Sequence, residues 1–227
     1  MFKKLLTLAL AGAMCLSLAA CGTTTETTTN NTVNNSNAIV NNSSNKNTIS
    51  GTDSGTYYAD IIVKDYGTIS VILDANTAPI TVENFVDLAN SDFYDGLTFH
   101  RIMEGFMIQG GDPMGNGMGG SDENIKGEFS ANGVDNDISH VRGVISMARQ
   151  GENPYTGEKN HDTASSQFFI VHQDSPFLDG QYAAFGHVTS GMEVVDAICA
   201  DSQPIDNNGT IPAEQQPIIE DVIIKNN

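Results

Sequence analysis

The chain has 227 residues, which suits one domain with attached segments or at most two small domains. It carries 28 Asp and Glu residues against 10 Lys and Arg residues, a formal net charge of −18 at pH 7. A surface of this charge repels nucleic acid and anionic lipid headgroups, so neither is predicted as a partner. The three cysteines predict no disulfide framework, because Cys15 and Cys21 lie at the extreme N-terminus and Cys199 falls in an apolar helical pattern.

Residues 1–20 predict a signal peptide. Lys3 and Lys4 form a basic start, and the apolar run that follows is short for a membrane-spanning helix. The run ends in LAAC at 18–21, which resembles the bacterial lipobox, where the cysteine receives a diacylglycerol and becomes the first residue after cleavage. An ordinary secretory signal that happens to contain a cysteine is the alternative. The sequence therefore predicts a protein anchored to the cell membrane through lipid on Cys21, with its domain on the extracytoplasmic side.

Residues 21–55 form a second distinct segment, rich in Thr, Asn and Ser and poor in apolar side chains. Such a segment cannot bury enough surface to offset its ordering entropy, so it predicts a flexible tether. Flexible-coil scaling gives it a root-mean-square span of roughly 30 Å. The folded domain is predicted to occupy residues 56–227.

The first half of that domain reads as strands around one helix. Alternating apolar residues predict a strand over 59–63 and another over 68–73, joined by a turn. Pro79 begins a helix that presents four apolar residues on one face, Val82, Phe85, Val86 and Ala89. Turn signals then separate strands over 97–102 and 106–109.

A glycine-rich stretch without periodicity, residues 110–128, predicts a long loop. The remaining elements are short apolar strands and one amphipathic helix, placed at 144–148, 167–172, 182–188, 191–199 (the helix) and 218–224. Many short strands, two helices and frequent turns predict an all-β fold, a closed barrel with helices covering its ends.

Six sequence blocks resemble the cyclophilins, a family of peptidyl-prolyl cis-trans isomerases. They are FHRIMEGFMIQGGD at 99–112, GNGMGG at 115–120, GVISMAR at 143–149, SSQFFIVH at 165–172, FLDGQYAAFGHV at 177–188 and GMEVVDAI at 191–198. The blocks occur in family order, and the resemblance extends over about residues 57–225. It implies a closed eight-stranded antiparallel barrel capped by two α-helices.

The resemblance also implies a site. Arg101 matches the family's catalytic arginine, and Gln109 matches a hydrogen-bonding position beside it. Arg149 stands where many relatives carry Asn, Phe177 where many eukaryotic relatives carry Trp, and Tyr182 where they carry His. The positions implied to bind substrate are Phe106, Met107, Ala148, Arg149, Gln167, Phe169, Phe177, Leu178 and Tyr182.

The implied reaction is rotation about an X–Pro amide, whose barrier is about 18–20 kcal/mol. No covalent bond changes, so neither a cofactor nor a metal is expected, and the five histidines show no metal-ligand spacing. The expected partners are proline-containing segments of exported proteins, bound by a monomer. A non-catalytic proline-binding chaperone or scaffold using the same groove is the alternative. Four carboxylates in or beside the glycine-rich loop could bind a cation, although a solvated acidic loop is preferred: Asp112, Asp122, Glu123 and Glu128.

Overall fold

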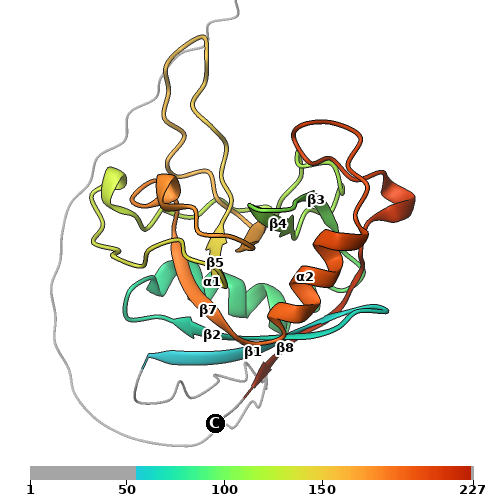
Figure 1. Cartoon of the computed structure of the whole chain (residues 1–227). Coiled ribbons are helices and arrows are strands. Elements are labelled where there is room, and N and C mark those ends of the chain that lie inside the picture. The colour runs from blue at the N-terminus through green and yellow to red at the C-terminus, as the bar shows by residue number, and fades with distance from the viewer. Residues whose placement is uncertain (1–54, 226–227) are drawn as a thin grey trace, which may run out of the picture. The chain divides into compact units, whose positions relative to one another are not determined.

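The structure, a computed structural model, describes residues 55–225 (Figure 1). The predicted signal peptide, the lipidation site Cys21 and the tether up to residue 54 lie outside the described residues. Within the described range, no helix combines the length and apolar character needed to cross a membrane.

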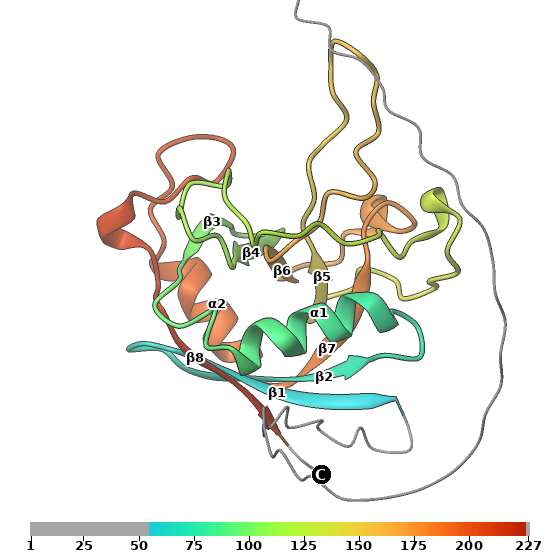
Figure 2. The same ribbon diagram turned by 180° about the vertical axis from the view of Figure 1, so that it is seen from behind.

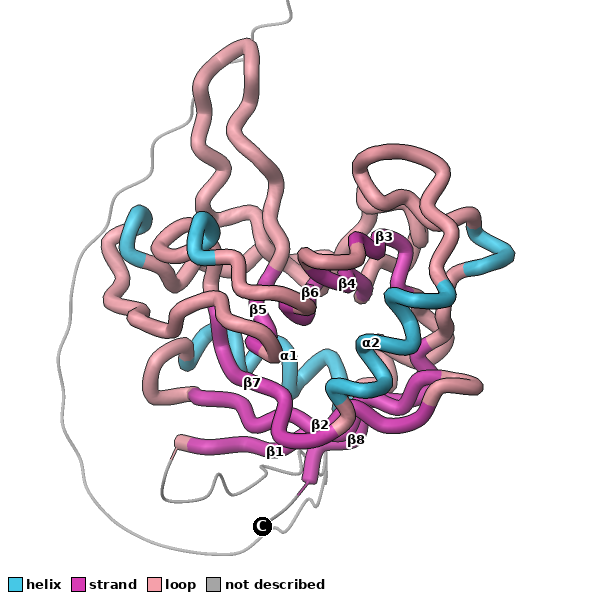
Figure 3. Tube along the Cα trace, in the orientation of Figure 1, coloured by secondary structure: helices cyan, strands magenta, loops and turns pink. Residues whose placement is uncertain are grey.

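Eight strands form one antiparallel sheet in the order β3-β4-β6-β5-β7-β2-β1-β8. Long loops join several of them, most visibly between β4 and β5 and between β5 and β6 (Figure 3). The strands are β1 Thr56–Val63, β2 Gly67–Asp74, β3 Phe99–Met103, β4 Met107–Gly110, β5 Val144–Met147, β6 Phe168–Val171, β7 Ala184–Ser190 and β8 Ile219–Lys225.

The sheet is curled but open, so the predicted closed barrel is wrong. Its edge strands, β3 and β8, meet through an isolated bridge between Thr98 and Ile218 rather than a continuous ladder. The reason lies in the segment that precedes β8. The amide N–H of Ile102 donates to the carbonyl of Gly209 at 2.8 Å, and the N–H of Ile211 donates to the carbonyl of His100 at 3.0 Å. Because this segment occupies the free side of β3, β8 cannot extend along it.

Two helices cover opposite sides of the curled sheet. α2, Met192–Asp201, lies in front in Figure 1, and α1, Pro79–Asn90, lies in front in the reverse view of Figure 2. The predicted apolar face of α1 is buried in the main core, as is the corresponding face of α2. Cys199 on α2 is 5% exposed, and burial raises the pKa of its thiol to about 12, as expected of an inert structural cysteine.

The N-terminus of α1 is capped from a distant part of the chain. Its N-cap residue, Ala78, has no side-chain hydrogen bond to offer. The carboxylate of Glu128 instead accepts hydrogen bonds from the backbone N–H of Ile80 at 3.1 Å and of Thr81 at 2.8 Å, and from the Thr81 hydroxyl at 2.7 Å. A negative group at this position satisfies free N–H groups and complements the helix dipole. The glycine-rich loop is thereby fixed to α1.

The sheet buries apolar side chains on both faces around β6. Phe168 and Ile170 point into the main core, whereas Phe169 and Val171 point outward into a smaller apolar cluster. Successive side chains of a strand face opposite sides, so four consecutive apolar residues imply burial on both faces. This outer cluster lies beneath the candidate functional site.

Candidate functional site

A β-bulge at His100 directs Arg101 to the outer face of the sheet. Phe99 pairs with Gly110, but Arg101 pairs with Gln109, so His100 is an extra residue on β3. Phe99 and Ile102 consequently both enter the core, and Arg101 lies outside it. A bulge often re-aims a side chain in this way beside a functional site.

The guanidinium of Arg101 is held in a fixed position. Its Nε–H donates to the carbonyl of Asn208 at 2.7 Å, and Nη1 donates to Oε1 of Gln109 at 3.2 Å. The other Nη contacts are to thioether sulfurs, Met107 Sδ at 3.6 Å and Met103 Sδ at 3.2 Å, which are weak acceptors. Burial lowers the pKa of the Arg101 guanidinium from its usual high value. The group remains a cation. Its Nε–H is firmly bonded, whereas its Nη donors mainly contact weak sulfur acceptors and are available to a ligand.

Gln109 is the first member of a chain of amides. Its Nε2 donates to Oε1 of Gln167 at 2.9 Å, and Nε2 of Gln167 donates to the carbonyl of Gly119 at 2.6 Å. These bonds fix the orientation of both amides, so that Oε1 of Gln109 faces Arg101. The glycine-rich loop thereby supports the position of Arg101.

A cavity of about 150 Å³ lies beside this guanidinium. Its floor is the outer apolar cluster, which includes Met107, Phe169 and Leu178, exposed by only 1%, 5% and 7%. The structure brings together nine of the eleven residues predicted for the groove: Arg101, Phe106, Met107, Gln109, Ala148, Arg149, Phe169, Leu178 and Tyr182. The Arg101 cation therefore faces a small cavity with an apolar floor.

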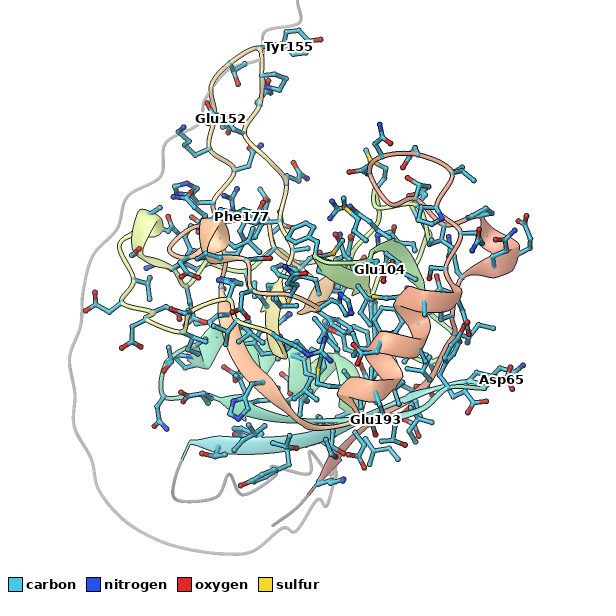
Figure 4. The ribbon with its side chains drawn as sticks, in the orientation of Figure 1. Asp65, Glu104, Glu152, Tyr155, Phe177 and Glu193 are labelled. Carbon is cyan, nitrogen blue, oxygen red and sulfur yellow. The ribbon has the colours of Figure 1, made fainter. Side chains whose placement is uncertain are left out.

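Two predicted residues lie just outside this cavity. Gln167 lines a larger adjoining cavity of about 780 Å³, which shares four wall residues with the first. Phe177 is 69% exposed and packs on Phe106, with ring centroids 5.4 Å apart (Figure 4). Phe177 thus belongs to the rim of the site rather than to the wall of the small cavity.

Arg149 lines the cavity and also forms hydrogen bonds to three backbone carbonyls. Its Nε donates to the carbonyl of Gln181 at 2.9 Å, and Nη1 donates to the carbonyls of Gln150 and Lys159 at 2.9 and 3.1 Å. Its guanidinium carbon lies 4.8 Å from the centre of the Tyr182 ring, a cation–π contact. Arg149 therefore orients Tyr182 and closes the base of the loop that follows β5.

A buried histidine beneath the cavity floor was not found by sequence reasoning. His140 is 1% exposed and stacks on Phe169, with ring centroids 6.0 Å apart. Its Nδ1 lies 2.9 Å from the carboxylate of Asp179, and its Nε2 lies 3.0 Å from the hydroxyl of Ser146. Since a carboxylate only accepts, Nδ1 carries the proton and Nε2 accepts from Ser146. The imidazole joins β5 to the turn after Leu178.

This burial predicts a pH-dependent stability. Burial lowers the pKa of His140 below 6.5, although Asp179 opposes the effect, and burial also lowers the pKa of His100. The unfolded chain therefore binds protons near pH 6.5 that the folded protein does not, so stability falls as the pH drops through and below that value. Each histidine contributes a slope of up to about 1.4 kcal/mol per pH unit. Urea unfolding at about pH 7 and about pH 5.5 measures it.

His140→Gln removes one of these two groups and is expected to reduce the pH slope by up to about half. The matched control is His187→Gln, an exposed histidine on β7, which should leave the slope as in the wild type. An undiminished slope in His140→Gln would show that this histidine does not couple folding to protons.

Two of the four carboxylates in or beside the glycine-rich loop, Asp112 and Glu128, stabilise the fold, whereas Asp122 and Glu123 are exposed. The carboxylate of Asp112 accepts hydrogen bonds from the backbone N–H groups of Met114, Asn116 and Gly117 at 2.8, 3.0 and 2.6 Å. Glu128 caps α1, as described above. Within the described part of the chain, no group of three or more His, Cys, Asp or Glu side chains is arranged to hold a metal ion.

Comparison with known proteins agrees with this geometry. Residues 58–226 match the family described as cyclophilin type peptidyl-prolyl cis-trans isomerase. Peptidyl-prolyl cis-trans isomerase B of Bacillus subtilis is 46% identical over 132 residues, which are 58% of this chain and 83% of the relative. An isomerase of Helicobacter pylori is 43% identical over 145 residues, 63% of this chain and 80% of the relative.

A solved structure shows the same fold. The crystal structure of a cyclophilin type isomerase from Cryptosporidium parvum superposes with a TM-score of 0.64 at 30% identity, over 76% of this chain and 99% of that one. The match covers nearly the whole of that crystallised chain, which therefore adopts this fold without a counterpart of the rest of the present chain. The chain belongs to the cyclophilin-type peptidyl-prolyl cis-trans isomerases.

Proposed function

We propose that this isomerase assists the folding of exported proteins and that it acts by non-covalent stabilisation of the twisted X–Pro amide. The observation that carries the mechanism is the Arg101 guanidinium, fixed beside a small apolar cavity with its Nη donors turned partly to weak sulfur acceptors. When an amide twists, it loses conjugation and the prolyl nitrogen gains a localised lone pair. A donor to that nitrogen is worth more in the twisted state than in the planar state, which is the requirement for catalysis.

The remaining cavity residues have complementary roles in this proposal. Phe106, Met107 and Phe169 hold the proline ring while the preceding carbonyl swings. An engineered cavity of about 150 Å³ in another protein admits benzene, so a cavity of about 150 Å³ here is large enough for a pyrrolidine ring, which would lie on the apolar floor. Gln109 keeps the Arg101 guanidinium in place. Because Gln167 in turn holds the Gln109 amide, neither group has to reorient during the reaction.

A relative supports a proline-containing peptide as the ligand. The Cryptosporidium parvum isomerase was also solved in the presence of the dipeptide Ala-Pro, with a TM-score of 0.63 and 30% identity to this chain. Proline-containing peptides are the substrates of cyclophilins. Because the groove contacts mainly backbone and the proline ring, the residue before proline is expected to be loosely specified.

The activity is tested by an isomerisation assay on residues 56–227 with a short Ala-Pro peptide. Two-dimensional exchange NMR measures the rate of cis-trans exchange in that peptide. Acceleration of the cis-trans exchange supports the enzyme. Binding of the peptide without acceleration would favour the alternative, a non-catalytic proline-binding chaperone or scaffold. We expect the domain to act as a monomer.

The cellular location rests on the N-terminal sequence. A basic start, an apolar run and LAAC at 18–21 support export, cleavage and lipidation of Cys21, and the segment 21–55 supports a tether. A diacylglycerol supplies two acyl chains, and two chains are the number needed for stable anchoring. The isomerase domain would then meet client proteins as they emerge on the extracytoplasmic side.

Cys21→Ala is expected to abolish lipid attachment and to leave the precursor uncleaved or the product released. Cys15→Ala, inside the apolar run, is the matched control and should leave attachment intact. Detergent partitioning of labelled cells measures the outcome. Wild-type protein in the aqueous phase would contradict the anchor.

A further inference from the structure

The loop between β5 and β6 includes a projecting arm, defined here as residues 150–163. It rises from the body of the domain and carries Tyr155 at its tip (Figures 1 and 4). Its turn is ordered: Asn153 and Glu158 are joined by a backbone hydrogen bond of 2.8 Å, and the Asn153 side chain accepts from the N–H groups of Tyr155 and Thr156 at 2.9 and 3.2 Å. Arg149 bonds the carbonyls of both legs at the base. These hydrogen bonds fix the backbone of the arm, and Tyr155 at its tip is exposed to solvent.

Tyr155 belongs to a larger pattern of exposure. Nine large apolar side chains are exposed in the described residues, and four of them are between 37% and 49% exposed. The other five are between 64% and 96% exposed, a clear gap. These five are Met114, Met118, Tyr155, Phe177 and Ile205.

All five lie on segments that contribute residues to the walls of the two cavities. Met118 lines the 780 Å³ cavity itself, and Met114 is on the same loop. The base of the arm contributes Gln150, Gly151 and Thr163 to that cavity, and the loop of Ile205 contributes Asn208 and Thr210. Phe177 packs on Phe106, which lines the small cavity. The five most exposed apolar side chains are therefore carried by the segments that form the cavity walls, whereas single exposed apolar residues are ordinarily scattered over the whole surface.

We propose that these five residues form an apolar rim that binds the stretches of an unfolded protein on either side of the proline. The proposal rests on the isomerase function above and names its preferred substrate class. A chain with its proline in the small cavity must leave the groove in both directions, and extended chain advances about 3.3 Å per residue. The flanking residues would first meet Met118, which lines the larger cavity, and Phe177, which packs on Phe106 at the small one.

The shape and chemistry of the rim select this occupant. Its residues come from four separate segments, and an extended chain can pass between them. Met side chains adapt to many sequences, and Tyr supplies apolar area at low entropic cost. The net charge of −18 disfavours docking on an anionic membrane. Apolar segments near proline are exposed only before a client protein has folded.

The test compares two substrates of the isomerase domain, residues 56–227. One is a short Ala-Pro tetrapeptide, and the other is a reduced, carboxymethylated protein whose refolding is limited by one prolyl bond. The rim variant is M118S/Y155S/I205S, and the matched control is I80S/V141S/I223S, three exposed apolar residues away from the mouth. The quantity measured is the ratio of kcat/KM for the protein to kcat/KM for the tetrapeptide.

The rim variant is expected to lower this ratio by about tenfold, and the control to keep it within about twofold of the wild type. Y155S alone, at a side chain that is 96% exposed, tests the arm without risk to folding and should lower the ratio in the same direction. An unchanged ratio in the rim variant would overturn the proposal. So would wild-type dimers that become monomers in that variant, since the rim would then be a self-association surface. A wild-type domain inactive on the tetrapeptide would instead contradict the isomerase function itself.

Discussion

Arg101→Ala is expected to lower kcat for prolyl isomerisation by about 10²–10³-fold, equivalent to about 2.7–4 kcal/mol, the usual effect of removing one well-placed donor from a dry site. Peptide affinity should fall less, because Phe106, Met107 and Phe169 still hold the proline ring. Exchange NMR on the Ala-Pro peptide gives the rate. The melting temperature shows whether the variant is folded.

Two further variants sharpen this test. Arg101→Lys should recover little activity, because an ammonium is a point charge without the rigid planar fork by which the guanidinium bonds the Asn208 carbonyl through Nε and Gln109 through Nη1. Arg142→Ala removes an exposed arginine paired with Asp196 and should leave the rate unchanged. If a folded Arg101→Ala domain isomerised the peptide at the wild-type rate, Arg101 would have no part in the mechanism and the cavity would be a binding site only.

The sequence predicted the elements well, and it named residues that the structure brings together. Local patterns were sufficient for the helix at Pro79, and for β6, where four apolar residues follow one another. The family resemblance then placed Arg101, Gln109 and Phe169 together, although 68 residues separate the first from the last. These features depend on side-chain type and order along the chain, which a sequence displays directly.

Features that depend on long-range backbone geometry were not predictable. The bulge at His100 decides which way Arg101 points, yet no residue type marks it. The carbonyl of Asn208 holds Arg101, and a carbonyl is present at every position. Its placement comes from Asp206, whose carboxylate accepts from the N–H groups of Asn208 and Thr210 at 2.9 and 3.0 Å.

The open edge of the sheet has the same origin. Closure of a barrel depends on whether the last strand can reach the free side of the first edge strand. Here the segment from Gly209 to Ile211 occupies that side of β3. Such competition between two segments for one strand edge is decided by packing over the whole domain, so strand count alone predicted closure wrongly.

Phe85→Ala is expected to reduce the free energy of unfolding by about 3–5 kcal/mol. The Phe85 side chain is fully buried on α1, and its ring lies 5.1 Å from Tyr94, 5.5 Å from Phe168 and 5.4 Å from Phe185, measured between centroids. Its loss leaves a cavity where the helix meets the sheet and removes three aromatic contacts. A domain of this size should then melt roughly 6–20 °C lower. Urea unfolding and calorimetry measure both quantities.

Ile80→Ala is the matched control, because it lies on the same helix but is 40% exposed, and it should cost less than about 1 kcal/mol. The folded fraction of Phe85→Ala should keep its isomerase rate, since Phe85 contacts Phe168 on the inner face of β6 while Phe169 forms the cavity floor on the outer face. A loss of stability no larger than that of Ile80→Ala would contradict the packing of α1. A folded variant with a strongly reduced rate would show that the two faces of β6 are coupled.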